Sequence, residues 1–283
     1  MERIKLAIEK AKSHSTQGVV SELRPVVESP APYQAPQHAP QAPIAAPESV
    51  EVQYDRTEVM ELDQALLDRH RVIAHQKTHP ASWAFDVLRT QVLQQMDENG
   101  WRTLAITSPT MESGKSLVAI NLAMSIAHQT DRTALLVDFD LRRPRIAPML
   151  GLHRSISLNE VLAGQATLAD AMVNPGLPRL VVLPTNRPVL KASEVLSSAK
   201  VGGLITELRE RYSDRIVVFD LPPILAADDV MAILPRIDCV LMVVGSGMST
   251  EKEIEESMAR LTKANVLGVV LNKDRTPTTN AYY

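Results

Sequence analysis

The chain has 283 residues, a formal net charge of −3, one cysteine, 22% charged residues and 45% hydrophobic residues. This length allows about two domains. The absence of a positive charge balance disfavours coating of a nucleic acid, and the lone Cys239 excludes a disulfide framework. No apolar run approaches the ~18 residues of a membrane span, and the charged start of the chain is unlike a signal peptide. We therefore expect a cytoplasmic protein without a nucleic-acid partner.

Residues 1–80 are expected to form an N-terminal extension. Residues 3–12 place apolar side chains at helical spacing, with lysine and arginine on the remaining surface. This short basic helix could dock onto a partner or an anionic membrane surface, or it could be a frayed polar lead-in.

A proline-rich segment follows in the same extension. Seven of the 19 prolines lie between Pro25 and Pro47, and residues 29–47 carry no charged side chain. Such a composition buries too little apolar surface to offset its ordering entropy, so we predict a largely disordered, semi-rigid linker. A further loosely amphipathic helix is predicted over residues 58–72.

The segment 82–96 predicts a helix whose apolar face packs on the domain that follows. The residues on that face are Trp83, Phe85, Val87, Leu88, Val92 and Met96.

Strands and helices alternate after Gly100. The segments 103–107, 134–138, 180–183, 216–220, 239–244 and 266–271 predict buried strands, and 116–128, 192–212 and 250–264 predict helices. This alternation indicates an α/β fold with a mostly parallel sheet and helices on both faces. We place this domain at residues 81–275, followed by a flexible tail at 276–283.

The turn after the first strand has the pattern of a phosphate-binding loop. It ends in Gly-Lys-Ser and opens a helix, so backbone N–H groups and a helix N-terminus face phosphate oxygens. Lys115 then supplies a point charge and Ser116 a Mg²⁺ ligand. The expected nucleotide contacts are Ser113, Gly114, Lys115, Ser116 and Leu117.

Two residues make this loop irregular. Pro109 occupies the first glycine position of G-x-x-x-x-G-K-[ST], so only the second half of the motif matches. Glu112 places a carboxylate near the phosphate site, where it could weaken ATP binding or tie down Mg²⁺ or Lys115. An ordinary surface turn remains the alternative interpretation of the string alone.

Two acidic motifs follow at strand ends. Asp138 and Asp140 end the second strand and can approach a metal–phosphate centre, with Asp138 also able to accept a hydroxyl proton. Asp220 ends another apolar strand and is placed to hold Mg²⁺ through water. Arg142 and Arg143 could contact phosphate or a partner, or form a solvated or locally paired face.

Several strings together resemble the bacterial tyrosine kinases of capsule and exopolysaccharide synthesis. These strings are Lys115-Ser116 with Asn121-Leu122-Ala123, Leu-Leu-Val-Asp-Phe-Asp-Leu-Arg-Arg-Pro at 135–144, and Asp220-Leu-Pro-Pro. The resemblance covers residues 82–273 and places the chain in the P-loop branch of cell-division and plasmid-partition ATPases. The N-terminal helix, the linker and the Asp220 segment are similar to the subgroup encoded with exosortase-associated exopolysaccharide loci.

The resemblance implies an ATP- and Mg²⁺-dependent tyrosine autokinase that regulates polysaccharide polymerisation or export. It implies Lys115, Asp138 and Asp140 as catalytic residues, Ser116, Asp138 and Asp220 at the metal, and Asn272 as an adenine contact. It also implies Tyr282 and Tyr283 as phosphoacceptors, against the alternative of a chance aromatic end. The implied partner is a separate membrane co-polymerase that sets chain length, which could bring the protein to the inner face of the membrane.

Departures from the family pattern bear on self-association. Family members carry E-x-x-R-x-x-R for ring assembly, whereas this chain has Trp83, Asp86 and Arg89 at those positions, so a homo-oligomer is expected with an incomplete motif. Thr110 stands where partition-type ATPases carry a signature lysine. Two alternatives stay open, a switch that hydrolyses ATP like the cell-division ATPases, and a catalytically weak nucleotide-binding scaffold of the assembly machinery.

Overall fold

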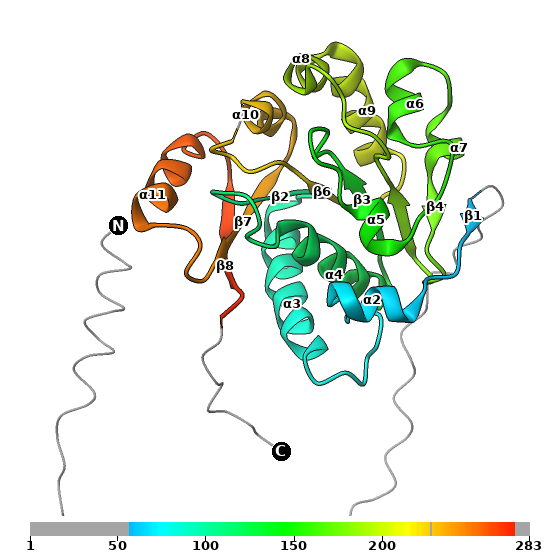
Figure 1. Ribbon diagram of the computed structural model, residues 1–283, viewed down its shortest axis with the longest axis horizontal. Coiled ribbons are helices and arrows are strands. Elements are labelled where there is room, and N and C mark those ends of the chain that lie inside the picture. Colours follow the sequence, from blue (N-terminus) through cyan, green and yellow to red (C-terminus); the bar gives the residue numbers. More distant parts are fainter. Residues whose placement is uncertain (1–56, 227, 275–283) are drawn as a thin grey trace, which may run out of the picture. The chain divides into compact units, whose positions relative to one another are not determined.

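The computed structural model describes residues 57–226 and 228–274, which contain an eight-stranded sheet with helices on both faces (Figure 1). The strand order is β1-β4-β5-β3-β6-β2-β7-β8, and every neighbouring pair is parallel except β4 and β5. The strands are β1 (Glu58–Val59), β2 (Thr103–Thr107), β3 (Thr133–Asp138), β4 (Val173–Asn174), β5 (Leu180–Leu183), β6 (Arg215–Asp220), β7 (Cys239–Gly245) and β8 (Val266–Asn272). The predicted α/β fold with a mostly parallel sheet is confirmed.

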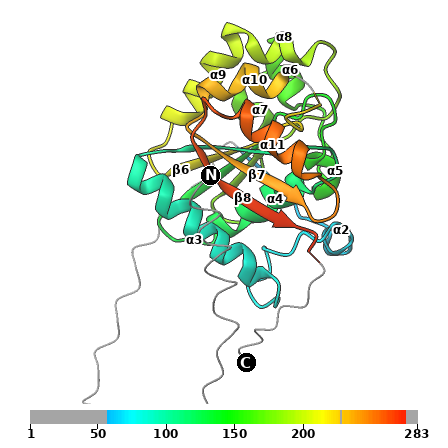
Figure 2. The same ribbon diagram turned by 90° about the vertical axis from the view of Figure 1, so that its left-hand side faces the viewer.

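The helices divide between the two faces of the sheet (Figures 1 and 2). Helices α2 (Gln64–His70), α3 (Ser82–Asn99), α4 (Lys115–Ala127) and α5 (Ile146–Leu150) contribute to one apolar cluster. The other cluster takes residues from α6 (Leu158–Ala163), α7 (Leu168–Ala171), α8 (Ala192–Ser197), α9 (Ala199–Glu210), α10 (Asp229–Ile233), the 3₁₀ turn Leu234–Arg236 and α11 (Glu251–Arg260).

The central strands explain why the sequence showed near-continuous apolar runs. Every residue of β2, β3, β6 and β7 is buried, because helices cover both faces of the sheet. In the register of β3 and β6, Asp138 lies opposite Asp220. The pairing therefore brings two of the three predicted acidic residues to the same end of the sheet.

The segment before α3 is fastened to the body by one buried amide. Asn121 of α4 accepts from the N–H groups of Ile73 and Ala74 at 2.8 and 2.9 Å, and it donates to the carbonyl oxygens of Leu117 and Arg71. Leu67, Val72 and Ala74 are buried in the same apolar cluster as α4. Packing therefore begins well before the expected domain boundary at residue 81.

Two predicted helices differ from the structure. Residues 58–72 contain the short strand β1 and the helix α2 rather than one helix, because Asp63 caps α2 by accepting from the N–H of Ala65. The predicted helix 192–212 is split into α8 and α9, because Ser198 has extended backbone angles and its hydroxyl caps α9.

The expectation for the apolar face of α3 is wrong at its start. Val92 and Met96 are buried as predicted, but Trp83 is 71% exposed and Val87 is also exposed. Phe85 and Leu88 pack against the core as predicted, so Trp83 and Val87 lie on the outward side of the same helix.

Some expectations lie outside the described residues. These are the basic helix 3–12, the linker 29–47 and the tail with Tyr282 and Tyr283. Among the residues that the structure does describe, no helix combines the length and the apolar character needed to cross a bilayer.

Replacing the Asn121 amide tests the attachment of this segment. We expect Asn121→Ala to lower the free energy of unfolding by about 2–4 kcal/mol, because the buried N–H of Ala74 and the partly buried N–H of Ile73 lose their acceptor. The matched control is Asn99→Ala, whose exposed side chain makes one hydrogen bond to Gln95. The control should change stability by about 0.5 kcal/mol or less. Urea unfolding of both variants measures the difference, and equal midpoints would contradict the assignment.

Candidate nucleotide site

The turn between β2 and α4 has the backbone of an anion-binding loop. Glu112 and Gly114 both have left-handed backbone angles, with φ of 63° and 89°. Gly114 is the N-cap of α4 and supplies no side-chain acceptor, so the first N–H groups of the helix remain available to a ligand. The positive φ at position 114 favours glycine, and a Cβ atom there would also displace the Asn272 amide from its present position.

Contacts from distant strands hold this loop. The Thr107 hydroxyl donates to the Pro222 carbonyl at 2.7 Å, which links β2 to the segment after β6. The Asn272 amide donates to the Ser113 carbonyl at 2.9 Å, which links the end of β8 to the loop. The structure thus places Asn272 against the phosphate loop, while its predicted contact with adenine stays a prediction.

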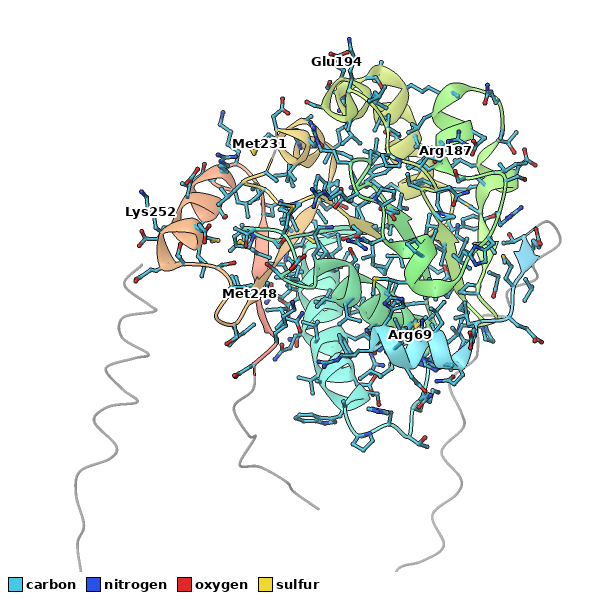
Figure 3. All side chains as sticks on the ribbon, viewed as in Figure 1. Arg69, Arg187, Glu194, Met231, Met248 and Lys252 are labelled. Atoms are coloured by element: carbon cyan, nitrogen blue, oxygen red, sulfur yellow. The ribbon has the colours of Figure 1, made fainter. Side chains whose placement is uncertain are left out.

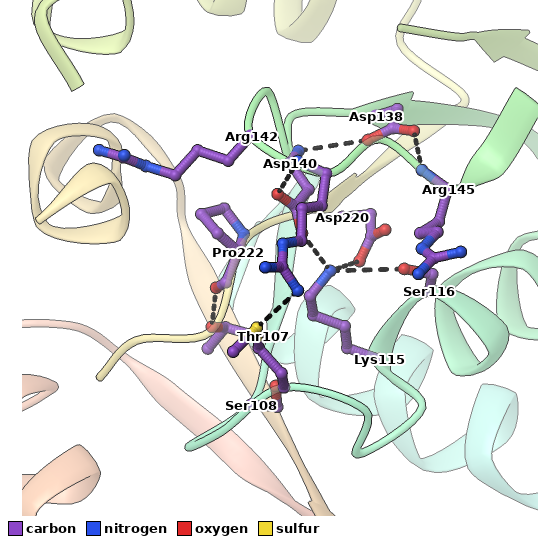
Figure 4. Close-up of polar contacts among 12 residues, drawn as sticks. Thr107, Ser108, Lys115, Ser116, Asp138, Asp140, Arg142, Arg145, Asp220 and Pro222 are labelled. Atoms are coloured by element: carbon purple, nitrogen blue, oxygen red, sulfur yellow. Dashed lines mark hydrogen bonds and ion pairs between the residues drawn. The ribbon is translucent and has the colours of Figure 1, made fainter. Parts of the chain in front are cut away.

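Lys115 joins the loop to two of the acidic residues (Figure 4). Its Nζ lies 2.8 Å from Asp140 Oδ2 and 3.4 Å from Asp220 Oδ1, and it donates to the Ser116 hydroxyl at 3.4 Å. Burial alone would lower the pKa of Lys115, but the charges of Asp220, Asp140 and Asp138 outweigh burial and raise that pKa. The ammonium group therefore stays charged at neutral pH.

Asp138 is buried at the end of β3, where its hydrogen bonds with the described residues come from backbone N–H groups. Its Oδ2 accepts from Arg145 and Ile146 at 3.0 Å each, and its Oδ1 accepts from Asp140 at 3.2 Å. Burial and the neighbouring Asp220 raise its pKa well above the ordinary value. In this arrangement the carboxyl group fixes the start of α5 and the loop that carries Asp140.

Asp220 and Ser116 have the donor chemistry of a divalent-cation site. Asp220 is fully buried and its Oδ2 has no hydrogen-bond partner among the described residues, so one hard oxygen remains free. Burial raises the pKa of Asp220 despite the opposing effect of Lys115 and a Ser116 hydrogen bond. The described residues contain no group of three or more His, Cys, Asp or Glu that could enclose a metal. The free carboxylate oxygen of Asp220 and the Ser116 hydroxyl are hard oxygen donors, and this donor chemistry fits Mg²⁺.

The irregular loop residues do not occupy the centre of the site. Glu112 is exposed, and the ion pairs of Lys115 are made with Asp140 and Asp220 instead. The Pro109 carbonyl accepts from the Leu225 N–H at 3.3 Å, so the missing glycine lies where the loop meets the segment after β6.

The sequence did not reveal how the arginines after Asp140 are used. Arg142 forms two hydrogen bonds with the buried Asp229 of α10, at 2.6 and 2.9 Å, which corresponds to the locally paired alternative. Arg145 was not singled out at all, and its backbone N–H is bonded to Asp138. Arg142 and Asp229 are 87 residues apart in the sequence, so no local periodic pattern could have predicted their ion pair.

Comparison with known proteins gives a consistent set of relatives. No family model matches the chain. The chain is 32% identical over 187 residues to tyrosine-protein kinase wzc of Salmonella typhi, covering 65% of this chain and 26% of that protein. It is 28% identical over 201 residues to the putative tyrosine-protein kinase CapB of Staphylococcus aureus, covering 70% and 87% respectively. The chain thus spans about a quarter of the first relative's length.

Solved structures agree with these relatives. The kinase domain of Escherichia coli tyrosine kinase ETK superposes with a TM-score of 0.68 at 28% identity, covering 80% of this chain and 92% of that one. The chimerical protein CapA2B2 gives 0.66 at 26% identity, covering 77% and 93%. The septum site-determining protein MinD from Pyrococcus horikoshii, solved with Mg-ADP, gives 0.51 at 25% identity, covering 60% and 69%.

The buried charge of Asp220 predicts a pH-dependent effect of its neutral variant. Because the folded-state pKa is raised above the unfolded value, stability from this group is present at low pH and is lost as pH rises through the folded pKa. Asp220→Asn removes that loss. We expect the free energy of unfolding of the variant, minus that of wild type, to be larger at pH 8 than at pH 4, so the variant gains stability relative to wild type as pH rises. Urea unfolding at both pH values measures this, and a difference that is constant or reversed would contradict it.

Proposed function

We propose that this chain, which belongs to the bacterial tyrosine kinase family, transfers the γ-phosphoryl group of ATP to tyrosine in a Mg²⁺-dependent reaction. The observation that carries the proposal is the position of Lys115, which follows the phosphate loop at the start of α4 and pairs with both Asp140 and Asp220. The relatives that are named tyrosine-protein kinases support the same activity. The matches cover 65% and 70% of this chain, which supports extending the proposal to it.

Different residues of the site bind the phosphates and the metal ion. The N–H groups at the start of α4 bind phosphate oxygens, and the charged Lys115 exchanges a carboxylate partner for a phosphate oxygen. When bound, Mg²⁺ neutralises charge on the phosphates, and Ser116, Asp138 and Asp220 are the residues proposed to hold it. Leu117, in the first turn of α4, completes the proposed nucleotide contacts.

The proposed proton acceptor lies among the same carboxylates. Asp138 is buried and has a raised pKa, and Asp140 lies next to Lys115 with a side chain that is 5% exposed. A carboxyl group with a raised pKa accepts a proton more readily than an ordinary aspartate. We therefore assign proton acceptance from the attacking tyrosine hydroxyl to Asp138, beside the Asp140 that pairs with Lys115.

We further propose a role in exopolysaccharide or capsule synthesis, with regulation of chain polymerisation or export. Tyr282 and Tyr283 are the proposed acceptors, a separate membrane co-polymerase is the proposed partner, and self-association would bring one chain's tail to another's site. The match covers 87% of the CapB relative, so that protein consists mostly of the matched domain. This supports a kinase whose membrane partner is a separate polypeptide. These assignments place the protein at the inner face of the membrane.

A nucleotide-dependent switch is the second candidate. The similarity to MinD with bound Mg-ADP favours it, because the same loop and sheet can hydrolyse ATP without a protein acceptor. A nucleotide-binding scaffold with little catalysis is the third.

Phosphate mapping distinguishes these candidates. We expect full-length protein incubated with Mg²⁺ and ATP to gain phosphate on Tyr282 and Tyr283, detected by mass spectrometry. Lys115→Ala should lose at least ~100-fold in rate, because it removes the charge next to the transferred group. Tyr282→Phe with Tyr283→Phe should abolish the label while leaving nucleotide binding intact.

The other outcomes select the alternatives. Phosphate release without phosphotyrosine would select the switch. Failure to bind nucleotide in calorimetry, with Lys115→Ala behaving like wild type, would select the scaffold and contradict the kinase.

A further inference from the structure

The nucleotide site is rich in negative charge before any phosphate enters it. One ammonium group, Lys115, faces the carboxyl groups of Asp140 and Asp220, and Asp138 lies directly behind them. Even with Asp138 left out, two carboxylates face one lysine. A nucleoside triphosphate adds several further negative charges, and one divalent cation offsets only two. The terminal phosphate therefore needs positive charge from another part of the rim.

The phosphate loop itself does not supply that charge. Its two other polar rim positions are Thr110, whose hydroxyl lies 3.1 Å from that of Ser249, and the exposed Glu112, which is acidic. The N–H groups of α4 remain, but they carry only the partial charge of a helix terminus. The missing cation must come from a neighbouring segment.

The loop between β3 and α5 carries three arginines, of which one is already used. Arg142 is bound by both oxygens of Asp229. Arg143 Nη1 lies 3.1 Å from the Met111 sulfur, which is a weak acceptor. The guanidinium of Arg145 makes no hydrogen bond or ion pair with any residue that the structure describes.

The backbone of Arg145 is fixed although its side chain is free. Its N–H is held by Asp138 Oδ2 at 3.0 Å, one residue before α5 begins. Figure 4 shows its side chain extending from this point toward Ser116, at the start of α4 and beside Lys115. A guanidinium held on a fixed backbone, exposed to solvent and facing the proposed cation ligand is placed to meet a phosphate oxygen.

We propose that Arg145 binds the terminal phosphate of the nucleotide in cis and makes the site discriminate nucleoside triphosphate from diphosphate. The inference rests on the proposed nucleotide function and adds a residue to it. Because this arginine belongs to the same chain, recognition of the γ-phosphate does not require a second subunit. Arg143, on the Met111 side, contacts the outer rim and contributes less to the discrimination.

Binding measurements test this role without relying on activity. We expect Arg145→Ala to weaken binding of a non-hydrolysable ATP analogue about tenfold or more in the presence of Mg²⁺, with ADP affinity changed less than about twofold. Arg145→Lys should restore part of the loss, because it keeps the charge but not the bidentate geometry. Isothermal titration calorimetry of the full chain gives both affinities.

Two matched variants complete the experiment. Arg69→Ala removes an exposed arginine of α2 on the outer surface of the protein (Figure 3) and should leave both affinities unchanged. Arg143→Ala should lower the ratio of analogue to ADP affinity by less than Arg145→Ala does. Unchanged ADP affinity also shows that a variant is folded.

The outcomes separate this inference from the proposed function. If wild type binds neither nucleotide, the proposed function fails and the inference fails with it. If wild type binds both and Arg145→Ala keeps the same affinity ratio, only the role of Arg145 is overturned. A larger loss in Arg143→Ala than in Arg145→Ala would likewise overturn it.

Discussion

The ion pairs of Lys115 are the interaction on which the site depends. Lys115 starts α4, Asp140 follows β3 and Asp220 ends β6, so one ammonium group gathers three segments that are far apart in sequence. Removing charged groups from water costs several kcal/mol per ion, and the attraction between buried opposite charges often does not offset that desolvation. Asp220 adds to the cost, because one of its buried oxygens has no partner among the described residues. A contribution to stability therefore does not account for the cluster, whereas the proposed binding of phosphate would give its charges a role.

The rest of the described fold keeps this cluster in place with neutral or fully satisfied polar contacts. Asp138 holds the start of α5, and Asn272 holds the phosphate loop from the far side of β7. Asn121 binds the segment before α3 to the same helix that carries Lys115. Each contact joins separate elements, so the loop rests on a rigid frame while its own N–H groups remain free for a ligand.

Most of the sheet was predictable because its signal is local. Buried parallel strands read as continuous apolar runs, and two of the predicted strands, 103–107 and 180–183, have the observed limits. Gly-Lys-Ser after a strand indicated the turn from β2 to α4 for the same reason, and the structure has that turn. The break at Ser198 and the short helices α5, α6, α7 and α10 were missed, because a single capping side chain or a tertiary contact decides them.

The site residues also fall into two groups, those that a local motif identifies and those whose role depends on a tertiary contact. Lys115, Asp140 and Asp220 were identified from motifs, and the structure brings them together. The pairing of Arg142 with Asp229 and the free guanidinium of Arg145 depend on which distant carboxyl groups fold beside them. Sequence spacing gives the type of residue at the site, whereas the folded arrangement decides which charges cancel and which remain available.

The same distinction applies to the altered self-association motif on α3. Arg89 retains the family's residue type, yet its Nη1 donates to Asp86 at 2.8 Å and to the Ser125 carbonyl and hydroxyl at 3.2 Å each. The Ser125 hydroxyl in turn donates to Asp86 at 2.8 Å, so the aspartate and the arginine neutralise each other against α4. An arginine used in this way contributes little charge to another subunit. Trp83, which replaces the acidic residue of that pattern, is 71% exposed in the first turn of the helix, so this position offers an apolar surface in place of a charge.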